Sequence, residues 1–242
     1  MGLFDFFQKG MAQEGLQELT LEALPLTEVA GLPLPCRVLP KGISGQQRMD
    51  LWKTAKAEAP AAWPLLVRLD DTLREHLEMT RYADGPLPDV DAYCKPYIDE
   101  VLTSEECAEL LGTEGDEGEG VTRFYSYDFG GKTQNLLVSV PCPQPWEVFK
   151  YFPLGGWNDC PEAGLMQAFC KELYETFGAV PAAIGSDTLE LIPARRPTDE
   201  EAFPLALRMY AFCPDVVMQG VGSVWALADS LKQSDIWSFW WD

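Results

Sequence analysis

The sequence has only one histidine, His76, among its 242 residues. Any Ser-His or Cys-His catalytic arrangement would have to use this side chain. It shares an expected helix face with Leu73, Leu77 and Thr80, which is typical of a histidine at the edge of a core. The scarcity of histidine therefore favours a non-catalytic protein.

Basic residues are also few, with 18 Lys and Arg against 38 Asp and Glu, and the formal net charge is −20. A field of this sign repels the phosphates of nucleic acids and the surfaces of anionic lipids. We therefore expect no nucleic acid and no membrane as a partner. The charge serves solubility, or it steers a basic protein partner towards the chain.

Long apolar runs and paired cysteines are missing as well. No run approaches the roughly 18 apolar residues that span a bilayer, and the first residues lack the basic start and apolar stretch of a signal peptide. The seven cysteines include no C-x-x-C pair and no spacing typical of a disulfide framework or zinc site. We expect a cytoplasmic protein with reduced thiols and no metal.

Two glycine-containing segments resemble fragments of nucleotide-binding motifs. The segment 130–133 ends like a P-loop, but Ser126 stands where that motif has its first glycine. The segment 220–222 lacks the third glycine of a dinucleotide fingerprint. We therefore expect no cofactor.

Hydrophobic periodicity divides the chain into three parts. Residues 1–111 predict an N-terminal α/β region, and residues 112–120 form an acidic, glycine-rich loop that we expect to be solvated and flexible. Residues 121–242 predict a C-terminal α+β domain, which either stands alone or continues the fold of the first region. The expected strands are 36–39, 64–69, 122–127, 135–140, 180–184 and 188–192. The first three expected helices are 44–58, 70–80 and 90–111. Three more follow: one ends near residue 177, one begins with a capping box at 198–201 and has Phe203 on its core face, and one is capped by Ser223.

The last six residues contain three of the eight tryptophans. Burying these rings contributes on the order of 10 kcal/mol as an upper bound, at about 25 cal/mol per Å² of apolar surface. Alternation places Trp237, Phe239 and Trp241 on one face and Ile236 and Trp240 on the other. Because both faces are apolar, we predict an interior strand of the sheet. The fold class is therefore α+β, with a mixed β-sheet flanked by amphipathic helices and the C-terminal strand buried in the sheet.

Several motifs in the second half carry a resemblance over about residues 133–242. They are PWEVF at 145–149, GGWNDCP at 155–161, DTLE at 187–190, AFCPD at 211–215, QG at 219–220 and WSFWWD at 237–242. This part resembles the bacterial family of domain of unknown function 4253. Relatives often have histidine before the Asp-Thr-Leu motif, where this chain has Ser186. The resemblance implies a bacterial origin and a domain boundary near residue 133. It implies no particular reaction.

Polar residues lie at the ends of the expected apolar elements, and we predict that they converge near one end of the terminal strand. Paired carboxylates there could bind a divalent metal or act as acid and base, or each could cap a helix or turn. Cys160, near a helix N-terminus, is a candidate reactive thiol, although Asp159 opposes this. The candidate cluster is Trp157, Asn158, Asp159, Asp187, Cys213, Asp215 and Gln219, with Asp242 as a fourth aspartate.

Two functions are compatible with the sequence. The first is a non-catalytic cytoplasmic binding protein, and one specific form is an acidic, immunity-like partner that neutralises a basic toxin. The alternative is a hydrolase-like enzyme that uses the aspartate cluster, with or without a divalent metal. The arginines 195 and 196 present guanidinium groups to an anion or, more simply, neutralise nearby acids.

Overall fold

The computed structural model describes residues 19–80, 82, 85–124 and 133–242. Residues 125–127 of the expected strand 122–127 and residues 130–132 of the P-loop-like segment lie outside this part. Residues 122–124 are described and do not form a strand. No described helix combines the length and the apolar character needed to cross a lipid bilayer.

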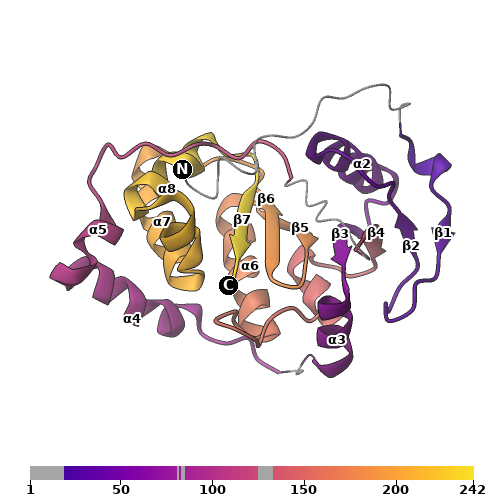
Figure 1. Ribbon diagram of the computed structural model, residues 1–242, viewed down its shortest axis with the longest axis horizontal. Helices are drawn as coiled ribbons and strands as arrows, with labels where there is room; N and C mark the ends of the chain where they lie inside the picture. The colour runs from indigo at the N-terminus through magenta and orange to yellow at the C-terminus, as the bar shows by residue number, and fades with distance from the viewer. Residues whose placement is uncertain (1–18, 81, 83–84, 125–132) are drawn as a thin grey trace.

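Seven strands form one mixed sheet in the order β1-β2-β4-β3-β5-β6-β7 (Figure 1). The pair β3 and β5 is parallel, and every other neighbouring pair is antiparallel. The strands are β1 (Leu26–Thr27), β2 (Cys36–Val38), β3 (Trp63–Leu69), β4 (Gln134–Val140), β5 (Val180–Ile184), β6 (Thr188–Ile192) and β7 (Trp237–Trp240). The predicted α+β class with a mixed sheet is confirmed.

Helices cover both faces of this sheet, and their starts follow sequence signals. Ser44 caps α2 and Thr198 caps α7, each in a capping box, and the Asp70 carboxylate accepts the amide of Leu73 at the start of α3. The α-helices are α2 (Gly45–Glu58), α3 (Asp71–Met79), α4 (Val90–Thr103), α5 (Ala108–Leu111), α6 (Ala163–Phe177), α7 (Asp199–Phe212) and α8 (Val224–Gln233). Short helices are η1 (Leu21–Ala23), η2 (Glu105–Cys107), η3 (Pro145–Lys150) and the π-helical η4 (Val216–Val221).

The two faces of the sheet belong to two separate apolar cores. Alternate residues of β3 divide between them: Leu65 and Val67 face the larger core, and Leu66 faces the smaller one. The larger core includes side chains of α6, α7 and α8, and the smaller core includes those of α2, among them Trp52. Both faces of β3 and β4 are therefore buried, as their continuous apolar sequences predict.

The terminal strand β7 is an edge strand, so the prediction of an interior position is wrong. It pairs with β6 alone in the described sheet. Trp237, Phe239 and Trp241 are each 1% exposed because they face the larger core, whereas Trp240 is half-buried. Apolar residues on both faces indicate that a strand is covered, and they do not show whether it is paired on both sides.

Strands from both sides of the acidic segment (residues 112–120) pair in the same sheet. Strand β3 precedes this segment in the chain and lies between β4 and β5, which follow it. The larger core likewise combines side chains from α3 and α4 with those of α6, α7 and α8.

Candidate functional site

Four residues of the predicted cluster surround the C-terminal end of β7. The amide of Trp241 donates to the Asp187 carbonyl at 3.0 Å, and the Cys213 thiol donates to the Trp240 carbonyl at 2.8 Å. The Asp242 amide donates to the Asp215 carboxylate at 3.1 Å. Gln219 joins the group because its amide nitrogen donates to the other oxygen of that carboxylate at 3.0 Å.

The loop 155–161 brings Trp157 to the same end of the sheet. Its indole N–H donates to the carbonyl of Ser186 at 2.9 Å, next to Asp187. Asn158 has a positive φ of 48°, and both Asn158 and Asp159 are exposed. The structure thus brings Trp157 to the turn that holds Asp187, while Asn158 and Asp159 face solvent.

Two carboxylates of this cluster, Asp187 and Asp215, are bonded to other groups of the protein. Arg68 forms an ion pair with Asp187 at 2.8 Å, and Asp215 accepts the two bonds from Gln219 and the Asp242 amide. Within the described residues, no group of three or more His, Cys, Asp or Glu side chains is arranged to hold a metal ion. Asp215 makes no side-chain cap bond to η4, so its bond to the Asp242 amide joins distant segments and differs from the expected helix cap.

The two cysteines of this region are buried thiols. Cys160 is 4% exposed, and burial, with smaller contributions from Cys213 and Asp187, raises the pKa of its thiol. Burial also raises the pKa of Cys213 to about 12. Because the thiolate is the nucleophilic form, this geometry gives no support to a reactive Cys160.

His76 lies against the candidate cluster. Its ring stacks on Trp157 with centroids 3.4 Å apart, and its Nδ1 is buried with no hydrogen-bond partner among the described residues. Burial lowers the pKa of His76, and the negative charges of Asp70 and Glu75 partly oppose this.

This environment predicts a pH-dependent stability. Because the folded pKa of His76 is lowered, the unfolded chain binds more protons as the pH falls through about 6.5, and the folded state loses stability. We expect the wild-type melting temperature to fall more between about pH 7.5 and 5.5 than that of His76→Gln. With one histidine in the chain, the comparison isolates this side chain. Equal losses in both proteins would contradict the burial effect.

The acidic segment lies along α8 and is not a detached loop. Figure 1 shows it crossing over α7 and α8. The amide of Gly118 donates to the Asp229 carboxylate at 3.1 Å, and the Ser230 hydroxyl donates to the Glu119 carbonyl at 2.6 Å. A Cβ at Gly118 would lie 2.0 Å from the Ala226 carbonyl oxygen. Its glycines therefore allow the backbone to approach the helix, while the side chains of Glu114, Glu117 and Glu119 are exposed to solvent.

Between this segment and the helices α7 and α8 is a groove of about 910 Å³, which we call the acidic groove. Its volume is within the range of small-molecule and peptide-side-chain sites. Six carboxylates and a single ammonium group line it. The lining residues are Glu114, Gly115, Asp116, Glu117, Gly118, Glu119, Asp199, Ala202, Phe203, Trp225, Ala228, Asp229, Lys232 and Gln233.

An aromatic pair lies among these charges. The rings of Phe203 and Trp225 stack with centroids 4.0 Å apart and an interplanar angle of 23°, and both residues are half-buried. Lys232 contacts Asp199 at 3.2 Å and Asp229 at 3.4 Å. A hydrogen bond from Ser223 lowers the pKa of Asp116 and so favours its charged form.

Sequence reasoning missed this groove. Phe203 packs against the larger core, as expected of the core face of its helix, and its ring also stacks on Trp225 at the groove. The available signal was the alternation of glycine and glutamate at 117–120, since Gly118 and Gly120 approach α8 while Glu117 and Glu119 are exposed.

The arginines 195 and 196 form ion pairs with Glu201 and Asp235, which agrees with the simpler of their two expected roles.

Comparison with known families identifies the C-terminal part. Residues 136–242 match the family described as Domain of unknown function (DUF4253), which confirms the resemblance predicted from the sequence motifs. No curated protein and no solved structure matches the chain. The matched residues include most of β4, all of β5 to β7, α6 to α8 and the candidate cluster, and they leave out β1 to β3 and the acidic segment.

Proposed function

We propose that this protein is a non-catalytic binding protein whose acidic groove accepts a lysine- or arginine-rich segment of a basic protein. The observation that carries the proposal is the combination of six carboxylates with a half-buried aromatic stack in one groove of about 910 Å³. An immunity-like protein that neutralises a basic toxin is one specific form of this function, and a cytoplasmic location fits the reduced cysteines.

The groove offers a cation two kinds of contact. A guanidinium or ammonium group over the Trp225 ring gains about 0.5–2 kcal/mol from the cation–π interaction. Exposed carboxylates at Glu114, Glu117 and Glu119 add charge-assisted contacts worth about 0.2–1 kcal/mol each, and they weaken as salt rises. The net charge of −20 would also accelerate association with a basic partner.

The alternative proposal, a hydrolase-like enzyme using the aspartates, has weaker support. Asp187 is paired with Arg68, and Asp215 is bonded to Gln219 and to the backbone of Asp242. A carboxylate in such bonds is less available as an acid or base for a substrate.

Neutralising the exposed part of the groove tests the proposal. We expect the triple variant Glu114→Gln, Glu117→Gln, Glu119→Gln to bind an oligo-arginine peptide roughly tenfold more weakly, from about 1.4 kcal/mol of lost contacts. Titration calorimetry at low and high salt measures this effect. Trp225→Ala should weaken binding in high salt as well, because its contribution is screened less.

A matched control separates the groove from overall charge. Glu105, Glu106 and Glu109 are also exposed, and they lie in η2 and α5, outside the groove. Their triple change to glutamine alters the net charge equally, and we expect peptide affinity to change less than twofold. An equal loss in both triple variants would reject the groove as the binding site.

A further inference from the structure

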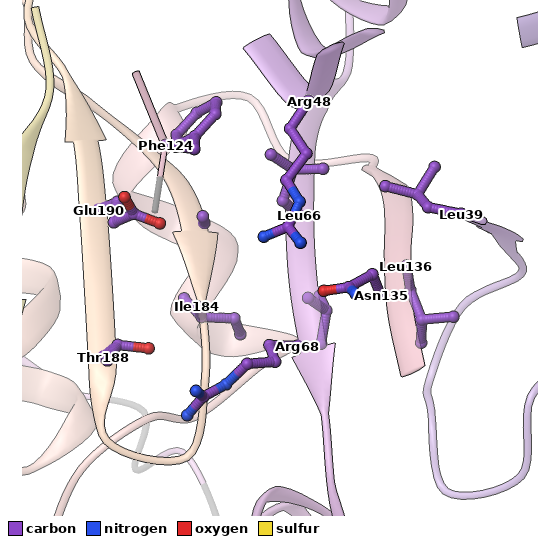
Figure 2. A pocket seen from close by; sticks show the side chains of 12 residues that line it. Leu39, Arg48, Leu66, Arg68, Phe124, Asn135, Leu136, Ile184, Thr188 and Glu190 are labelled. Atoms are coloured by element: carbon purple, nitrogen blue, oxygen red, sulfur yellow. The ribbon is translucent and has the colours of Figure 1, made fainter. Parts of the chain in front are cut away.

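The pocket between α2 and the sheet is too small for a charged ligand. Figure 2 shows Arg48, Arg68 and Glu190 pointing into it, and its volume of about 20 Å³ holds about one water molecule. Arg68 already forms an ion pair with Asp187. The acidic groove, at about 910 Å³, is the larger hollow, and it contains a cation that belongs to the protein itself.

That cation is the ammonium group of Lys232, in the last turn of α8. It lies 3.2 Å from Asp199 of α7 and 3.4 Å from Asp229 of α8. Hydrogen bonds to these two carboxylates raise the pKa of Lys232, so the ammonium form persists at neutral pH. Among the described residues that line the groove, Lys232 has the only positively charged side chain. Its position shows where the groove holds a cation.

The two carboxylates that hold Lys232 differ in their other contacts. The Oδ2 atom of Asp229 accepts hydrogen bonds from the Gly118 amide at 3.1 Å and from the Gln233 side chain at 2.9 Å. Asp199, the first residue of α7, has a side chain that is 91% exposed. Because Lys232 follows Asp229 by three residues in α8, it can keep this contact without Asp199. Asp199 is therefore the carboxylate that an incoming cation can reach.

The aromatic stack of the groove lies about one helical turn from Asp199. Asp199 and Phe203 are four residues apart in α7, so they share a face of that helix. Phe203 stacks on Trp225 with ring centroids 4.0 Å apart. One turn advances an α-helix by about 5.4 Å. A basic segment can therefore place one cationic side chain on Trp225 and a second one at Asp199.

We propose that Lys232 is an internal competitor of the basic partner: it occupies Asp199 in the free protein, and a cationic side chain of the partner replaces it there. This inference rests on the proposed function of the acidic groove. Exchanging one exposed ion pair for another changes the free energy little, so a single basic side chain gains little at Asp199. A segment with several basic residues also gains contacts with Trp225 and with the exposed glutamates of the groove. Lys232 thus favours multiply basic segments over single cations.

Peptide titration of Lys232→Met tests this inference. Methionine keeps an unbranched side chain and removes the charge, which leaves Asp199 free. We expect an oligo-arginine peptide to bind this variant roughly fivefold more tightly than the wild type at low salt, measured by calorimetry. Lys95→Met is the matched control, because Lys95 pairs with Asp99 at 2.6 Å in α4, outside the groove. It changes the net charge equally and also frees a carboxylate, and its affinity should change less than twofold.

A double-mutant cycle separates competition from a general effect of charge. With Lys232 in place, Asp199→Asn removes the contact of the partner and also that of its competitor, so we expect less than a twofold change in peptide affinity. In the Lys232→Met background, Asp199 binds the partner directly, and the same substitution should weaken binding at least threefold. Equal effects of Asp199→Asn in the two backgrounds would show that Lys232 acts only as a distant charge, and the inference would be wrong.

The outcomes distinguish this inference from the proposed function. If neither the wild type nor Lys232→Met binds the peptide, both are wrong. If the wild type binds and Lys232→Met binds equally or more weakly, the groove remains the binding site and only the role of Lys232 is rejected. Thermal melts check that each variant folds. If Lys232→Met does not fold, Lys232→Gln must bind the peptide more tightly than the wild type for the inference to stand.

Discussion

A chain that ends at Ile236 should not fold cooperatively. The deletion removes Trp237, Phe239 and Trp241, each 1% exposed in the larger core. Removing one buried aromatic side chain typically costs about 3–5 kcal/mol, so the three together match or exceed a net stability of about 5–15 kcal/mol. We expect insoluble protein or a molten state, measured as loss of the cooperative melt in circular dichroism and as dye binding to exposed apolar surface.

The aromatic contacts of these residues explain the expected size of the effect. Phe239 packs edge-on against Phe169 and Phe212 with centroids 5.9 and 6.0 Å apart, and Trp237 packs edge-on against Phe177 at 5.3 Å. The deletion thus removes the edge-on partners of these rings and leaves Phe169 of α6 and Phe212 of α7 with their stacking on each other. These rings are the centre of the larger core.

Two milder changes are the controls for the deletion. Removing Asp242 alone loses one bond, from its amide to Asp215. Ser238→Ala changes a half-buried hydroxyl that has no hydrogen-bond partner among the described residues. Both proteins should melt within a few degrees of the wild type. A soluble deletion protein with a sharp melt would show that the rings add little to the core.

Gly155→Ala should be the most damaging single glycine substitution in the loop that carries Trp157. Gly155 has a φ of 107°, and a Cβ there would lie 1.8 Å from the carbonyl oxygen of Pro161. The loop would have to open and break the bond from the Gly156 amide to the Cys160 carbonyl, which is 3.0 Å long. We expect at least about 3 kcal/mol of destabilisation and a melting temperature lower by roughly 6–12 °C.

Gly156→Ala is the matched control for this substitution. Its φ is also positive, at 86°, but the nearest atom to an added Cβ is Glu162 Cγ at 3.9 Å. The backbone strain alone costs about 1–2 kcal/mol. Comparing the two melts therefore separates the clash from the strain, and equal losses would contradict the close approach of Gly155 to Pro161.

The sequence by itself determined most of the local structure. The capping residues Ser44, Asp70 and Thr198 lie where the helices α2, α3 and α7 begin, and the apolar run of β4 is covered on both faces. Caps and periodicity depend on neighbours within a few residues of the same chain. For this reason caps and periodicity can be predicted without knowing which other helix or strand packs against the segment. The motifs of the matched family are also short runs of neighbouring residues, so they too were recognised from the sequence.

Only the tertiary structure decided which elements are neighbours. The acidity of residues 112–120 was evident, but the role of Gly118 depends on α8, about a hundred residues later. The edge position of β7 and the ion pair between Arg68 of β3 and Asp187 of the β5–β6 turn likewise depend on strand order. Strand order is set by long-range packing and loop-closure entropy, which leave no periodic trace in the sequence. The acidic groove arises from such distant pairs, and for this reason the sequence by itself did not reveal it.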